Sequence, residues 1–201
     1  MSAATMLACS ANSIVMGKHS SIGPIAPQLI LQTQLGRQIV PAQAILDQFE
    51  LAKDECQDPK KLGSWLPILG QYGPALLLQC QNAIDLSNQL VSEWLESFMF
   101  SGEKDADKKS TQIAKYLSDH KKFKTHGRHI GRDKAKEIGL IIEDLEQDQQ
   151  LQDLVLSVFH ATTHTFGGTG PIKIIENHLG RAFIKQQQMV LIPPGNIPKQ
   201  K

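Results

Sequence analysis

The start of the chain constrains its fold more than any other stretch. Residues 2 to 11 are small or apolar throughout and rich in alanine, and a short β-prone run, Ser13 to Met16, follows almost at once. Small residues of this kind favour a tightly packed helix, which Ser2 is able to cap. A buried helix followed by a buried strand predicts an α/β fold. Because free termini are usually polar and frayed, we also expect the chain to be the C-terminal portion of a longer fold.

Long amphipathic helices are predicted for much of the chain after residue 40. Apolar residues recur at helical spacing from Pro41 to Glu55, from Pro74 to Phe100 and after Asp107, with Gly63 to Gly73 forming a turn. A short helix, Asp133 to Ile138, ends at Gly139 before the strand Leu140 to Ile142, and a further amphipathic helix covers Leu151 to Phe159. We therefore expect one domain over residues 1–180. Residues 181–201 form a strand-like run, Met189 to Ile192, and a disordered tail.

Charge and cysteine content exclude several classes of function. The 21 basic and 20 acidic residues leave a net charge of +1, too small to attract nucleic acid as the main partner. No apolar run reaches the length of a membrane-spanning helix, which requires about 20 residues. Three cysteines without CxxC spacing, Cys9, Cys56 and Cys80, fit the reducing environment of the cytoplasm. His160 and His164 have the i, i+4 spacing of metal ligands, but Ala161 replaces the usual zincin glutamate, so no metal or cofactor is expected.

A serine at the start of a small-residue helix suits nucleophilic catalysis. The unpaired N–H groups and the positive dipole end of such a helix can stabilise a developing oxyanion. Alternatively, Ser2 caps the helix and has no catalytic role. The spacing of Ser2 from other residues does not decide between these two roles.

Three linked motifs extend this observation into a resemblance that covers the chain to about Gly180. Met1-Ser2-Ala3-Ala4-Thr5-Met6, Ser13-Ile14-Val15-Met16 and Gly23-Pro24-Ile25-Ala26-Pro27-Gln28 resemble the nucleophile region of the serine dehydrogenase proteinase family. These are Clp-fold serine proteinases, related to the Clp proteolytic subunit, to signal peptide peptidase A and to the crotonase-like superfamily. Residues 125–130, Thr-His-Gly-Arg-His-Ile, and the segment 135–140 after them resemble the family's second catalytic loop. The resemblance implies a Clp/crotonase-like spiral fold and peptide hydrolysis.

Carried over to this chain, the resemblance places the nucleophile on Ser2, the general base on His126 and one oxyanion donor on the backbone N–H of Ala3. The family's aspartate position is occupied by Ala26, whose methyl group cannot orient an imidazole. Asp119, seven residues before His126, is a candidate replacement for this acid. Lys18 and His19 are alternative bases, because Ser-Lys dyads occur on related folds.

The resemblance also implies partners: a peptide or protein substrate, further copies of the same chain and a membrane tether through a region upstream of Met1. Two other hypotheses remain. The same fold could be a non-catalytic interaction or scaffold module, which Ala26 favours. Alternatively, removal of Met1 would leave Ser2 with a free amine as base, as in N-terminal nucleophile hydrolases.

Overall fold

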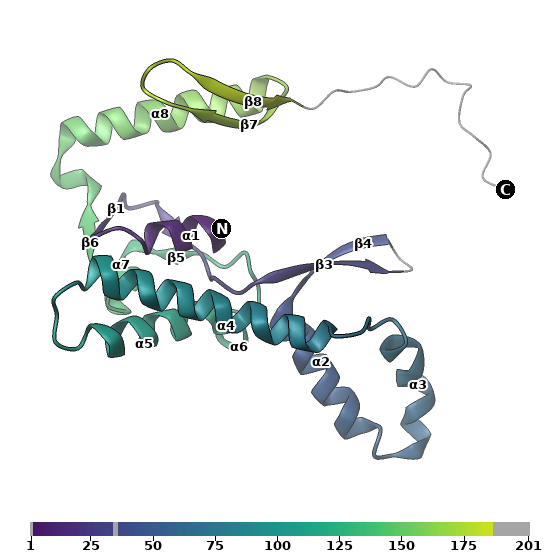
Figure 1. Cartoon of the computed structure of the whole chain (residues 1–201). Coiled ribbons are helices and arrows are strands. Elements are labelled where there is room, and N and C mark those ends of the chain that lie inside the picture. The colour runs from purple at the N-terminus through teal and green to yellow at the C-terminus, as the bar shows by residue number, and fades with distance from the viewer. Residues whose placement is uncertain (1, 34–35, 187–201) are drawn as a thin grey trace, which may run out of the picture. The chain divides into compact units, whose positions relative to one another are not determined.

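The computed structural model describes residues 2–33 and 36–186, and the chain forms two compact units, Met1–Gln147 and Asp148–Lys201 (Figure 1). Helices and short strands are mixed along both, as predicted for an α/β chain. The boundary we expected, after Gly180, lies in the turn between strands β7 (Pro171–Glu176) and β8 (Ala182–Gln186). These two strands pair with each other, so they belong to one unit.

Short strands from distant parts of the sequence pair in the first unit. Strand β1 (Ile14–Met16) runs parallel to β6 (Ile142–Asp144), and β2 (Ser21–Ile22) runs antiparallel to β5 (Ile130–Gly131). A hairpin that we had not predicted joins β3 (Gln28–Thr33) to β4 (Gly36–Pro41). Helix α1 (Ser2–Ala8) precedes these strands, in the predicted order of helix and then strand.

The helices predicted for the first unit are present. They are α2 (Ala42–Glu55), α4 (Leu76–Trp94), α5 (Ala106–Ser118) and α7 (Arg132–Glu137). The helix expected over Pro74 to Phe100 ends as an α-helix at Trp94 and continues as a π-helical turn, Leu95–Met99. A single-turn helix, α6 (His120–Phe123), and a 3-10 turn, Leu145–Gln147, complete the unit. Gly139 ends α7 with a φ of 99°, a conformation that favours glycine.

The turn predicted from Gly63 to Gly73 is wrong over most of its length, because helix α3 occupies Pro59–Leu69. Its start has strong local signals: Asp58 accepts a hydrogen bond from the N–H of Lys60, and Pro59 occupies the first turn. The helix also contains Gly63 and Pro67, which we took as breakers. Its capped start outweighs them, since Pro67 lies in the last turn, where little helix remains to be disrupted.

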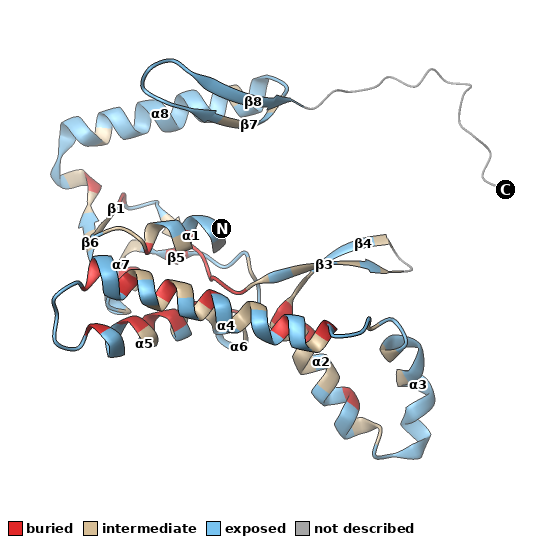
Figure 2. Ribbon diagram, in the orientation of Figure 1, coloured by how far each residue is buried: buried red, intermediate tan, exposed pale blue. Residues whose placement is uncertain are grey.

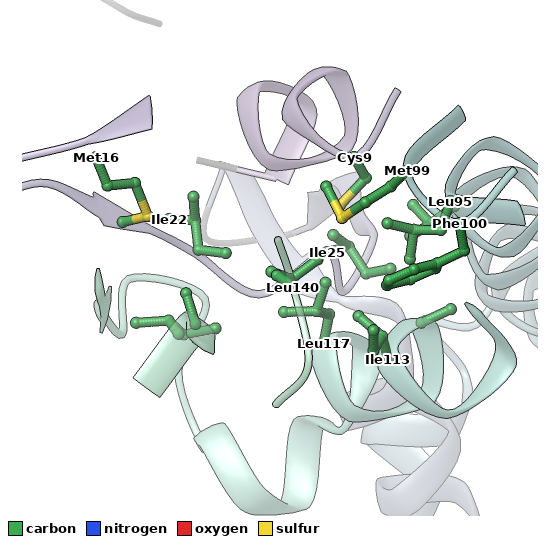
Figure 3. Close-up of a cluster of buried hydrophobic side chains, with 14 of the residues drawn as sticks. Cys9, Met16, Ile22, Ile25, Leu95, Met99, Phe100, Ile113, Leu117 and Leu140 are labelled. Atoms are coloured by element: carbon green, nitrogen blue, oxygen red, sulfur yellow. The ribbon is translucent and has the colours of Figure 1, made fainter. Parts of the chain in front are cut away.

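The main core of the first unit is built from α1, the short strands, α4 and α5. Cys9 and Met16 from the start of the chain belong to the same buried cluster as Leu95, Phe100 and Leu140. Cys9 lies close to Met99, and Met16 lies close to Ile22 (Figure 3). A smaller cluster joins Ala42 and Ile45 of α2 to Leu76 and Cys80 of α4. The start of the chain is therefore fixed against the central helices.

The second unit consists of α8 (Gln149–Gly168) and the β7–β8 hairpin. Asp148 begins the helix by accepting a hydrogen bond from the N–H of Leu151. Throughout residues 148–186 no side chain is classed as buried (Figure 2). The predicted strand-like run Met189 to Ile192 and the predicted tail lie outside the described residues.

Candidate functional site

The antiparallel pairing of β2 with β5 brings two of the predicted catalytic loops together. Its register sets Ile22 opposite Ile130. Ala26 follows Ile22 by four residues, and His126 precedes Ile130 by four residues. The backbone of Ala26 lies against the imidazole of His126, close enough to influence its protonation. Position 26, where the resemblance places an acid, is thus beside the predicted base.

The environment of His126 favours its neutral form. Burial lowers the pKa of His126 below its ordinary value, and the adjacent Ala26 backbone offsets part of this effect by favouring the charged form. Its Nδ1 is buried and has no hydrogen-bond partner in the described part of the chain. Ala26 is 5% exposed, and its side chain, a methyl group, contains no hydrogen-bonding atom. A neutral imidazole can accept a proton, but nothing described here fixes its tautomer through Nδ1.

Helix α1 is attached to the same loop. The N–H of Gly23 donates to the hydroxyl of Thr5 at 2.9 Å, and Thr5 is buried. Two residues further on, the N–H of Ile25 donates to the Leu117 carbonyl at 3.0 Å, and the Ile25 side chain enters the core (Figure 3). These bonds join α1, the 23–27 loop and α5 into one packed assembly.

The predicted nucleophile belongs to this assembly through its backbone. Ser2 is the first residue of α1, three positions before Thr5. The side chain of Ser2 lies outside the described residues. Ala3 follows in the first turn, where the backbone N–H groups have no acceptor within the helix.

The other predicted participants, Asp119, Lys18 and His19, are described by contacts of their own. Asp119 caps α6, where its carboxylate accepts a hydrogen bond from the N–H of Lys122 at 3.0 Å. Lys18 and His19 occupy the exposed turn between β1 and β2, and the backbone N–H of Lys18 donates to Glu146 at 2.7 Å. None of the three is among the groups that shift the pKa of His126.

The sequence analysis missed a second pairing of serine with histidine. The hydroxyl of Ser21 lies 2.7 Å from Nδ1 of His129, across the same β2–β5 pair. Serine and histidine in hydrogen-bond contact are the minimal arrangement of an activated nucleophile. The residues are 108 positions apart, and neither lies in a pattern that would have identified the contact from sequence.

It also missed a cluster of charges around Arg132. The guanidinium, only 13% exposed, binds Glu146 at 2.5 Å and Asp144 at 3.4 Å, and Lys136 binds the same Asp144. The backbone N–H of Lys18 and the nearby Arg132 lower the pKa of Glu146. Because these groups link β6 to the start of α7 and neutralise one another, we assign the cluster a structural role.

A cavity of about 530 Å³ in the first unit is lined by none of the predicted catalytic residues. It lies between the β3–β4 hairpin and helices α2 and α4, next to Ile45, Tyr72 and Leu76. Its lining carries no charged side chain, and its polar groups are mainly the amides of Gln32, Gln38, Gln48, Gln71 and Gln79.

Over residues 2–33 and 36–186 there is no group of three histidine, cysteine or acidic side chains that could hold a metal ion. The helices in these ranges also lack the combination of length and hydropathy needed to cross a bilayer.

Comparison of the chain with protein-family models, with curated proteins and with solved structures finds no match.

Proposed function

We propose that the chain is a serine peptidase of the serine dehydrogenase proteinase type, with Ser2 as nucleophile and His126 as general base. The observation that supports it is the position of Ala26 beside His126. The resemblance placed these residues in two catalytic loops a hundred positions apart, and the loops lie together as such a site requires. The mixture of helices and short strands, including the parallel pair β1–β6, is compatible with the spiral Clp-like fold that this function implies.

In this mechanism Ser2 attacks the peptide carbonyl while His126 accepts the hydroxyl proton. The imidazolium then returns that proton to the leaving amine, and the backbone N–H of Ala3 binds the oxyanion. Burial lowers the pKa of His126, which keeps the imidazole neutral and able to act as base. Without a carboxylate at position 26, the imidazolium lacks a stabilising partner, so turnover is expected to be slow.

The compartment proposed for this activity is the cytoplasm. All three cysteines are free thiols, and two of them, Cys9 and Cys80, are buried in the cores. Free thiols of this kind persist in a reducing environment.

A fluorophosphonate probe that labels activated serines tests the proposal. Wild type and Ser10→Ala are expected to be labelled, whereas Ser2→Ala is expected to lose labelling and His126→Gln to slow it. Ser10 is a matched control because it also lies near α1, where its hydroxyl bonds the Leu7 carbonyl. Labelling that survives in Ser2→Ala but disappears in Ser21→Ala would reject Ser2 as nucleophile and assign that role to the Ser21–His129 pair.

Intact-mass measurement of the same samples decides the N-terminal nucleophile alternative, because retention of Met1 leaves Ser2 without a free amine. A second candidate function, a non-catalytic scaffold module, is favoured by the methyl group of Ala26 next to His126. Absence of labelling in folded wild-type protein at every accessible pH would support that module over the peptidase.

A further inference from the structure

The second unit exposes nearly all of its apolar side chains. Twelve large hydrophobic residues of this unit are exposed, and none of its described residues is buried. They are Leu151, Leu154, Val155, Leu156, Val158, Phe159, Phe166, Ile172, Ile175, Leu179, Phe183 and Ile184. A lone hairpin or a lone helix is marginally stable in water, so these surfaces need a partner.

Most of these side chains on α8 form one stripe. At 100° per residue, Leu151, Leu154, Val155, Val158, Phe159 and Phe166 fall within an arc of about 140°. They are between 39% and 67% exposed, although such a stripe normally faces a core. Leu151, Val155 and Val158 also follow the alternating four and three spacing of a seam between two helices. The stripe therefore fits another helix.

The stripe contains no charge. Its polar members are Thr162 and Thr165, and the Thr165 hydroxyl already donates to the Ala161 carbonyl at 2.9 Å. Asp153, His160 and His164 project from the opposite side of the helix. An uncharged stripe can lie against an identical one around a two-fold axis without bringing like charges together.

Other surfaces fit less well. A membrane-surface helix carries Lys or Arg on its polar face, and α8 has neither. In the hairpin, Lys173 pairs directly with Lys185, on the face that also carries Ile175 and Phe183. A two-fold axis through that face would bring four lysines together. These charges leave α8 as the self-complementary surface.

We infer that α8 is the interface through which two copies of this chain form an isologous dimer. From their exposed fractions, the six side chains of the stripe present roughly 400 to 500 Å² of apolar surface per copy, which corresponds to an interface smaller than the standard size of about 800 Å² per partner. The inference rests on the second unit alone and does not require the peptidase proposal.

Sedimentation or light scattering of the full chain measures the assembly. Wild type is expected at twice the 22.2 kDa chain mass. Val158→Glu, which puts a charge in the middle of the stripe, is expected to weaken the dimer at least tenfold. His160→Glu puts the same charge on the opposite side and is expected to leave the dimer unchanged. A monomeric wild type, or equal effects of the two variants, would overturn the inference.

Cross-linking gives an answer that does not depend on a destabilising substitution. Val158 lies at the middle of α8, so two copies of residue 158 meet in either helix orientation. With Cys56 replaced by serine and Cys9 and Cys80 buried, Val158→Cys is expected to form dimers with a short bis-maleimide, and His160→Cys is not. The dimer would be refuted if Val158→Cys does not cross-link although the α8 amides are protected from hydrogen exchange. That result would assign the stripe to a partner within the same chain.

Discussion

Replacing Ala26 by aspartate tests the geometry on which the proposed site depends. If position 26 faces the imidazole, the new carboxylate lies within contact of His126. An opposite charge at that distance raises a histidine pKa by about 1 to 3 units. In wild type, burial holds the pKa of His126 below its ordinary value of about 6.5. The histidine of Ala26→Asp should therefore titrate at least about one unit higher than that of wild type.

The assay is a pH titration of the histidine ring signals by NMR. The chain has seven histidines, so His126→Gln is needed to identify the relevant signal. Ala26→Asn provides the matched control, because it has the size of aspartate without the charge. Equal titration of His126 in the Asp and Asn variants would show that the two loops are not adjacent, and the proposed site would fail.

Stability and activity should follow the same shift. Ala26 is buried, so either larger side chain costs about 1 to 3 kcal/mol through overpacking. Because the folded-state pKa of His126 is higher in Ala26→Asp than in Ala26→Asn, Ala26→Asp gains stability relative to Ala26→Asn at pH values below both folded pKa values, and this advantage fades as the pH rises through the pKa of His126 in Ala26→Asp. For catalysis, an orienting acid is worth up to about 10⁴, so at least a tenfold gain in peptide-ester hydrolysis is expected.

Three further predictions follow from burial. Leu117→Ala should lower the free energy of unfolding by about 2 to 5 kcal/mol in urea titrations, because Leu117 is fully buried in the main core. Cys56 should react with Ellman's reagent in the native protein, whereas the buried Cys9 and Cys80 should react only on unfolding. Burial raises the pKa of Cys9 to about 12, which further slows its reaction. Prompt reaction of all three cysteines would contradict the packing. Because folding lowers the pKa of His126, the unfolded chain binds more protons than the folded chain at acidic pH. The stability of the protein should therefore fall as the pH drops below about 6.5. Thermal melts of His126→Gln should show a weaker dependence on pH than those of wild type.

The helices of the first unit could largely be predicted because their signals are local. The apolar spacing of α2 and α5 and the glycine after α7 are properties of a few neighbouring residues. The α3 helix shows the limit of this reasoning. Gly63 and Pro67 normally break helices, but the Asp58 cap and the position of Pro67 near the end reduce their effect.

Strand pairing was harder to predict for a physical reason. Strands β2 and β5 contain two residues each, too few to show an alternating pattern, and their pairing spans more than a hundred positions. The contact of Ser21 with His129 depends on that pairing, so no short-range signal reveals it. The neighbourhood of Ala26 and His126 was accessible only because two sequence motifs implied that their loops meet.

The buried Nδ1 of His126 does not by itself mark a functional site. A buried Nδ1 without a partner costs about 1 to 3 kcal/mol, and an apolar residue of similar volume would avoid that cost. Three other buried polar atoms in the described part of the first unit, Asn88 Oδ1, Ser110 Oγ and Arg132 Nε, also have no hydrogen-bond partner, so this cost is not peculiar to His126. What distinguishes His126 is its position: the backbone of Ala26, where the resemblance places an acid, lies against the imidazole, and burial lowers its pKa, which favours the neutral ring. The same reasoning separates the two proposed functions, because a scaffold gains nothing from that imidazole, whereas a hydrolase requires a neutral base at this position.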